Sequence, residues 1–126
     1  MVKYLALTII SILLLACSPT RMLNGTWTGV GDQIDGAKWD VVLTVKNADI
    51  NIDYPSLKCG GEWRLVKKPE TTIEFKELIL FGADKCDQGV EVHVKKISND
   101  KLEVLYYLRE YDPTNPVATA ELNKVD

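Results

Sequence analysis

The stretch Trp39-Asp40-Val41-Val42-Leu43-Thr44-Val45-Lys46-Asn47 decides the fold, because apolar and polar side chains alternate along it. Val41, Leu43 and Val45 fall on one side of an extended chain, and polar side chains fall on the other. A period of two residues is typical of a β-strand that has one face in a core and one face in water. We therefore expect a half-buried strand over residues 39–47.

The same alternation recurs along the chain, and turn-forming residues separate the alternating segments. No internal repeat, low-complexity stretch or convincing helix interrupts the pattern. The pattern predicts eight strands: Gly25 to Gly31, Trp39 to Asn47, Ile50 to Tyr54, Gly61 to Lys67, Thr71 to Phe81, Val90 to Ile97, Leu102 to Tyr111 and Val117 to Lys124.

Short connections between successive strands favour hairpins, so each strand is expected to pair with the next. Eight strands in such a meander avoid exposed edges most simply by closing on themselves. The predicted fold is therefore all-β: a small, antiparallel, up-and-down barrel of eight strands over residues 24–126.

A short motif at the start of the first strand supports this architecture. Gly25-Thr26-Trp27 resembles the Gly-x-Trp opening of lipocalins and other calycin barrels. The resemblance implies that Trp27 plugs one end of the barrel and that an arginine from a late strand covers it, a role that Arg109 could fill. It also makes Trp27 a candidate ligand-binding residue of a lipocalin-like cavity.

The first sixteen residues have the features of an export signal. Lys3 supplies the positive charge, and Leu5 to Leu15 forms an apolar run too short to span a bilayer comfortably. The ending Leu14-Leu15-Ala16-Cys17 resembles the lipobox of bacterial lipoproteins. The resemblance implies cleavage before Cys17, followed by acylation of its sulfur and its amino group. An uncleaved signal anchor and an ordinary signal peptide with an incidental cysteine are the alternatives.

The lipobox divides the chain into a signal peptide over residues 1–16, a lipidated N-terminus with a short linker over 17–23, and the barrel domain. Ser18 follows Cys17 where an aspartate would resemble an inner-membrane retention signal, so we expect the outer membrane, facing the periplasm. Without Lys3, 14 basic residues face 18 acidic ones, a net charge of −4 with His93 neutral. This acidic balance argues against a nucleic-acid partner.

Two cysteines remain once Cys17 carries lipid. Cys59 lies in Tyr54-Pro55-Ser56-Leu57-Lys58-Cys59-Gly60-Gly61, which joins two strand-like runs, and the other cysteine is Cys86. Because exported chains meet an oxidising compartment, we expect a Cys59–Cys86 disulfide that ties the middle of the chain to itself. Two free, buried thiols are the alternative. No Cys-x-x-Cys motif is present, so redox catalysis is not expected.

A second resemblance covers residues 25 to about 108. The elements Tyr54-Pro55-Ser56-Leu57-x-Cys59-Gly60-Gly61, Phe75-x-Glu77-x-Ile79-x-x-Gly82 and Cys86-x-x-Gly89 are similar to a recurring small bacterial extracytoplasmic domain, many of whose members are uncharacterised. The resemblance implies a compact β domain with a Cys59–Cys86 bridge, and it implies no activity that carries over to this chain.

Glu77 is the most informative polar residue, because alternation places it on the same face as Phe75 and Ile79. A carboxylate that faces a core needs a partner or a role. Three interpretations stay open: a structural ion pair or hydrogen bonds from loop amides, a polar anchor inside a ligand cavity, or a β-bulge near Lys76 that turns Glu77 outward.

The sequence does not predict an enzyme. His93 stands alone on a polar face, whereas a zinc site needs three or four convergent ligands. Neither a Gly-x-Ser-x-Gly motif nor a glycine-rich phosphate loop is present. We expect no cofactor and no metal.

Tyr107, Arg109 and Tyr111 alternate with Tyr106 and Leu108, so they are a candidate outer stripe for protein contact. The leading functional prediction is a monomeric, membrane-anchored envelope lipoprotein that acts as a non-catalytic binding module through protein contacts. The alternative is the binding of a small hydrophobic ligand in a lipocalin-like cavity, oriented by Glu77.

Overall fold

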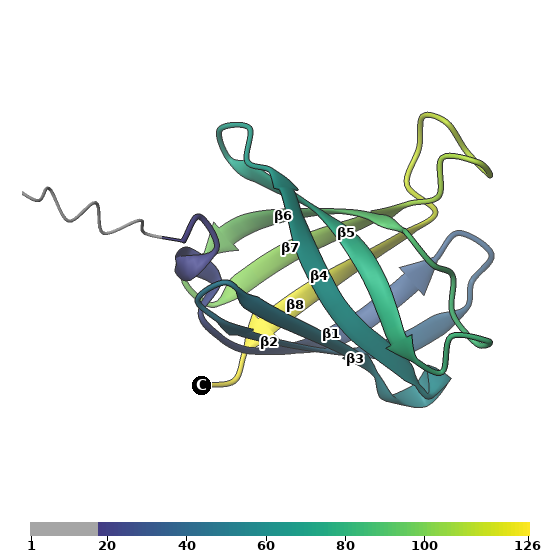
Figure 1. Ribbon diagram of the computed structural model, residues 1–126, viewed down its shortest axis with the longest axis horizontal. Helices are drawn as coiled ribbons and strands as arrows, with labels where there is room; N and C mark the ends of the chain where they lie inside the picture. Colours follow the sequence, from purple (N-terminus) through teal and green to yellow (C-terminus); the bar gives the residue numbers. More distant parts are fainter. Residues whose placement is uncertain (1–17) are drawn as a thin grey trace, which may run out of the picture.

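The computed structural model describes residues 18–126 and confirms the predicted all-β barrel (Figure 1). Each strand pairs antiparallel with the next, and the last strand pairs with the first. The strands are β1 (Gly25–Gln33), β2 (Lys38–Lys46), β3 (Asp49–Tyr54), β4 (Cys59–Lys67), β5 (Thr72–Phe81), β6 (Glu91–Ser98), β7 (Lys101–Tyr107) and β8 (Ala118–Lys124), with short 3-10 helices η1 (Arg21–Leu23) and η2 (Pro55–Leu57).

The predicted signal peptide, residues 1–16, and the predicted lipidation site Cys17 lie outside the described residues. Within residues 18–126, no helix has the length and hydropathy that crossing a membrane requires.

The largest difference from the predicted strands is at the end of β7, which stops at Tyr107 and not at Tyr111. The chain turns there because the carbonyl oxygen of Leu108 accepts hydrogen bonds from the amides of Tyr111 and Asp112. Alternation is a local signal, and it continued past the point where the backbone leaves the sheet. Arg109 and Tyr111 are therefore loop residues.

The core lies inside the barrel, where the inward faces of all eight strands meet. Val41, Leu43 and Val45 are buried, as their alternation in the sequence predicted. Larger side chains fill the middle of the barrel; the Trp63 and Phe75 rings, for example, lie 5.6 Å apart between centroids. The centre of the barrel is therefore packed by the protein's own side chains.

One end of the barrel is closed by the chain that precedes β1. Leu23 of η1 is buried, and its carbonyl oxygen accepts a 2.8 Å hydrogen bond from the Trp27 indole nitrogen. Lys124 Nζ lies 5.7 Å from the Trp27 ring centroid. The expectation that Arg109 covers Trp27 is wrong, because Arg109 follows β7 at the opposite end. Part of the expected linker, η1, belongs to the packed fold.

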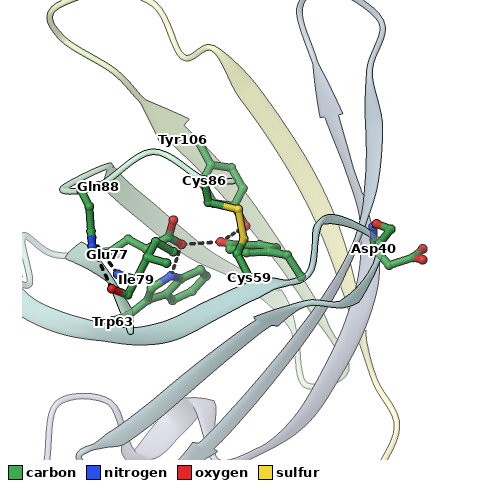
Figure 2. Close-up of a disulfide and its surroundings, with 10 residues drawn as sticks. Asp40, Cys59, Trp63, Glu77, Ile79, Cys86, Gln88 and Tyr106 are labelled. Carbon is green, nitrogen blue, oxygen red and sulfur yellow. Dashed lines mark hydrogen bonds between the residues drawn. A yellow bond between two sulfur atoms is a disulfide. The ribbon is translucent and has the colours of Figure 1, made fainter. Parts of the chain in front are cut away.

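At the opposite end, four connections gather: the β1–β2 loop, η2, the β5–β6 loop and the β7–β8 loop (Figure 1). Residues 82–90 form a strap where β5 and β6 diverge beyond Glu77. The Gln88 amide binds both backbone groups of Ile79 at 2.8 Å, and the predicted Cys59–Cys86 disulfide, which is confirmed, ties the strap to β4 (Figure 2).

The strap needs a glycine at its start. Gly82 has a φ of +64°, and a Cβ there would lie 2.1 Å from the carbonyl oxygen of Lys58. This close approach lets the strap cross directly over the first residues of β4.

Candidate functional site

The end of the barrel that carries the strap holds an open pocket of about 350 Å³. Trp39, Tyr54 and Tyr106 form its aromatic floor, and its walls are largely apolar, with Leu57, Val90, Leu108, Val117 and Ala118 among them. Cys86 of the disulfide also lines it. The barrel is thus plugged at one end and hollow at the other.

The aromatic floor follows from the positions of three inward residues along their strands. Trp39 is the second residue of β2, Tyr54 is the last residue of β3, and Tyr106 is the penultimate residue of β7. All three strand ends point to the open end of an up-and-down barrel. The Trp39 ring contacts Tyr54 and Tyr106 edge-on, with both centroid distances at 5.2 Å, which is a favoured aromatic geometry.

Glu77 lies beneath this floor, with its side chain pointing into the barrel and only 4% exposed. Its Oε2 atom accepts a 2.8 Å hydrogen bond from the Trp63 indole nitrogen and a short one from the Tyr54 hydroxyl (Figure 2). The hydroxyls of Tyr54 and Tyr106 lie 3.2 Å apart. Glu77 is in register with Trp63, so no bulge turns it outward.

The hydrogen-bond partners of the Glu77 side chain are therefore side chains from two other strands, Tyr54 of β3 and Trp63 of β4, and not the loop amides or ion pair that the sequence suggested. Glu77 itself is not among the residues that line the pocket. Tyr54 and Tyr106 connect Glu77 to the pocket, because both tyrosines line the pocket and belong to the hydrogen-bond network of Glu77.

Burial governs the electrostatics of this network. Desolvation raises the pKa of Glu77, against the opposing hydrogen bonds from Tyr54 and Trp63, and the charge of Asp87 raises it further. Burial also raises the pKa of both Tyr54 and Tyr106. Both tyrosines therefore remain neutral hydrogen-bond donors across the physiological pH range.

A different polar cluster lies on the outer face of the same sheet. His93 Nε2 is 2.7 Å from Glu91 Oε2 and 3.1 Å from Glu74 Oε1. These three potential metal ligands lie within 4.8 Å of one another, so His93 does not stand alone as the sequence suggested. Glu74 is directly opposite His93 on the neighbouring strand, a pairing that alternation within one strand does not reveal.

Cations already occupy this outer cluster. Arg109 donates a 2.6 Å hydrogen bond to Glu91, and Lys67 lies 4.0 Å from Glu74. The Arg109 hydrogen bond lowers the pKa of Glu91. The arrangement is that of an ion-pair network that joins β4, β5, β6 and the start of the β7–β8 loop.

The structure divides the other candidate residues between three places. Arg109 stacks over Tyr107, with 4.2 Å between the guanidinium carbon and the ring centroid, within the outer cluster. Tyr111 lies in the β7–β8 loop and lines the pocket. Trp27 is fully buried at the closed end, away from the pocket. The three residues of the expected contact stripe are therefore not on one face.

Trp39, Tyr54 and Tyr106 were not predicted from the sequence as site residues. A signal for them was available, because each is an inward-facing aromatic residue within two positions of a strand end, and the three ends meet in the predicted barrel.

Comparisons of the chain with protein-family models, curated proteins and solved structures found no match.

Proposed function

We propose that this chain is a non-catalytic binding module of the bacterial cell envelope, and that it holds a small molecule with an apolar body at the open end of the barrel. The observation that carries the proposal is the pocket of about 350 Å³ with its apolar walls and aromatic floor. Small-molecule sites have this size and character, with a few polar groups that fix orientation. Tyr54 and Tyr106, backed by Glu77, are such groups.

The filled centre of the barrel limits the size of the ligand. Trp63 and Phe75 are buried below the floor, so the ligand occupies the mouth and does not run through the barrel. This geometry suits a molecule of one or two rings or a short alkyl chain.

A fluorescent, neutral, apolar probe, N-phenyl-1-naphthylamine, tests the proposal. The wild type should bind it saturably. Ala118→Phe places a ring in the pocket and should weaken binding about tenfold or more, whereas Thr119→Phe, the next residue and on the outer face, should bind normally. Thermal melts check that both variants fold. A wild type without saturable binding, or equal binding by the two variants, would contradict the proposal.

A protein partner is the second candidate, and the rim of the pocket favours it. Ile34 is 64% exposed and Tyr111 is 74% exposed, and both line the pocket mouth. Exposed apolar residues beside a cavity suit a partner that seats one side chain in it. A photo-crosslinking residue at position 34 or 111 should then give one discrete protein adduct in the intact envelope, and the same residue at position 119 should give none.

The proposed location depends on Cys17. The lipobox resemblance supports acylation there, and the described chain begins at the closed end of the barrel, so an anchor attached at residue 17 leaves the pocket facing away from the membrane (Figure 1). Several acyl chains give stable anchoring. The intact mass of membrane-extracted protein should show a chain that starts at Cys17 and carries acyl groups, including palmitate. An unmodified chain that starts elsewhere would refute the anchor.

A further inference from the structure

We infer that the pocket selects organic cations, namely a protonated amine attached to a short apolar body, over neutral and anionic molecules of the same shape. This inference rests on the proposed function and names the ligand class for the same site. Three independent features of residues 18–126 support it: the missing counter-ion of Glu77, the direction of the hydrogen bonds, and the charge around the mouth.

Glu77 is a buried carboxylate without a cation. No lysine, arginine or histidine of the described chain forms an ion pair with it. Buried charges in proteins are normally paired, because removal from water is costly. Its two donors, Tyr54 and Trp63, are neutral. A positive charge in the pocket would therefore supply the counter-ion that this carboxyl group lacks within the described residues.

The hydrogen bonds of the network run toward Glu77 and leave acceptors free. Tyr54 has one hydroxyl proton, which goes to the carboxylate as the stronger acceptor, so the contact between the two tyrosine hydroxyls uses the proton of Tyr106. The Tyr106 oxygen then keeps an unused lone pair, and Glu77 Oε1 makes no hydrogen bond within the described residues. Because Tyr106 lines the pocket, its oxygen offers a ligand a hydrogen-bond acceptor, to which an ammonium group can donate and a carboxylate cannot.

The mouth also carries the negative charge of the domain. The four connections at this end, counted together with the strand ends next to them as residues 32–40, 53–58, 82–90 and 108–117, hold eight acidic and four basic residues. Their net charge of −4 equals that of residues 18–126 as a whole. A field of one sign at a cleft raises the local concentration of the opposite ion and its rate of association.

The charged residues that line the pocket agree with this balance. Asp35 and Asp87 line it, as do Lys38 and Lys85. Lys38 is already paired with Asp32 at 3.2 Å, so its charge is compensated. The carboxyl groups in and beneath the pocket are therefore those of Asp35, Asp87 and Glu77. Lys85 is the one lysine of the lining that forms no ion pair within the described residues.

Three eight-carbon molecules that differ in the head group test the inference: n-octylamine, 1-octanol and octanoate. Each is used at pH 7 to displace N-phenyl-1-naphthylamine from the wild type and from Glu77→Gln. Glutamine keeps an acceptor for Tyr54 and Trp63 but removes the charge. The wild type should bind octylamine about tenfold more tightly than octanol, and octanoate most weakly, because hydrogen bonds to charged groups are stronger. Glu77→Gln should lose the preference for the amine over octanol.

The outcomes separate the inference from the proposed function. Displacement by all three molecules with equal affinity, or tightest binding of octanoate, would overturn the inference and leave the binding pocket standing. No displacement by any of them, together with no saturable binding of the probe, would overturn the proposed function itself. If Glu77→Gln does not fold, Asp35→Asn combined with Asp87→Asn, two exposed changes, should reduce the amine preference about two- to fivefold. An unchanged preference in that double variant would count against the inference.

Discussion

Glu77 and Glu91 are two carboxylates on opposite faces of the same sheet, and they differ in almost every physical respect. They are nearly neighbours, because Glu91 of β6 pairs with Lys76 of β5, the residue before Glu77. Glu77 points inward and accepts hydrogen bonds from the neutral Trp63 and Tyr54. Glu91 points outward and binds His93 at 2.7 Å and Arg109 at 2.6 Å.

The contrast shows how environment sets the role of an identical group. Burial raises the pKa of Glu77, whereas the hydrogen bond from Arg109 lowers the pKa of Glu91. Glu91 in its charged form stabilises the fold, and Glu77 in its charged form opposes it. A group that costs stability and lies beneath a pocket is a candidate for function, and a group that stabilises a surface network has a sufficient structural role.

The largest expected effect on stability comes from removing the disulfide that ties the strap, residues 82–90, to β4 near Glu77. Cys59→Ala combined with Cys86→Ala should lower the free energy of unfolding by about 3.5 kcal/mol, because the unfolded chain regains the freedom of the loop between them. Urea denaturation measures this loss.

The double variant should also distinguish the two carboxylates. With the strap free, water reaches Glu77 and its pKa should return toward the ordinary value, while the pKa of Glu91 should not change. Titration of the carboxyl groups by NMR checks both. An equal change at the two carboxylates would contradict the difference in environment.

The next largest effect on stability comes from replacing Glu77, the buried hydrogen-bond acceptor. Glu77→Leu leaves the Trp63 indole and the Tyr54 hydroxyl buried without their partner, and should lower the free energy of unfolding by about 2–4 kcal/mol. The matched control, Glu77→Gln, keeps an acceptor and should cost less than about 1 kcal/mol at pH 7. If the two variants were equally stable in urea, the network would not hold the floor of the pocket.

The fold could be predicted from the sequence because its signal is local. Alternation such as that of Val41, Leu43 and Val45 marks a strand and its buried face, and turn residues mark the hairpins. The end of β7 could not be predicted, because it depends on amide contacts to the Leu108 carbonyl. These contacts belong to the turn that begins the β7–β8 loop, and the alternation of apolar and polar residues does not encode them.

The site could be predicted only in part. Glu77 stood out because a polar residue on an inward face breaks the pattern. Its partners Tyr54 and Trp63 could not be identified, because cross-barrel neighbours depend on the stagger of the strands, which alternation leaves open. The pocket volume depends on how four loops fold, and no strand pattern encodes it.

The pH dependence of stability should separate the two carboxylates by sign. Because the pKa of Glu77 is raised in the folded state, the folded protein binds more protons than the unfolded chain at pH values between the ordinary pKa of 4.5 and that raised pKa. Stability should fall as pH rises through this window, by at most about 1.4 kcal/mol per pH unit. Urea denaturation of the wild type and Glu77→Gln against pH isolates this effect. If the free energy of unfolding of the wild type instead rose relative to that of Glu77→Gln as pH increased, the prediction would be contradicted.

Glu91→Gln should have the smallest effect on stability. The contribution of Glu91 to stability should also depend on pH with the opposite sign to that of Glu77. The lowered pKa of Glu91 means that its stabilisation is fully present above about pH 4.5 and is lost as pH falls through the folded pKa. Because the group is close to solvent, the loss at pH 7 should be below about 1 kcal/mol, and 1 M NaCl should reduce it further. The effect of Glu77→Leu should be insensitive to salt, since its cause is a pair of buried, neutral donors. A Glu91→Gln loss that matched that of Glu77→Leu and resisted salt would show that the outer network is as important to the fold as the inner one.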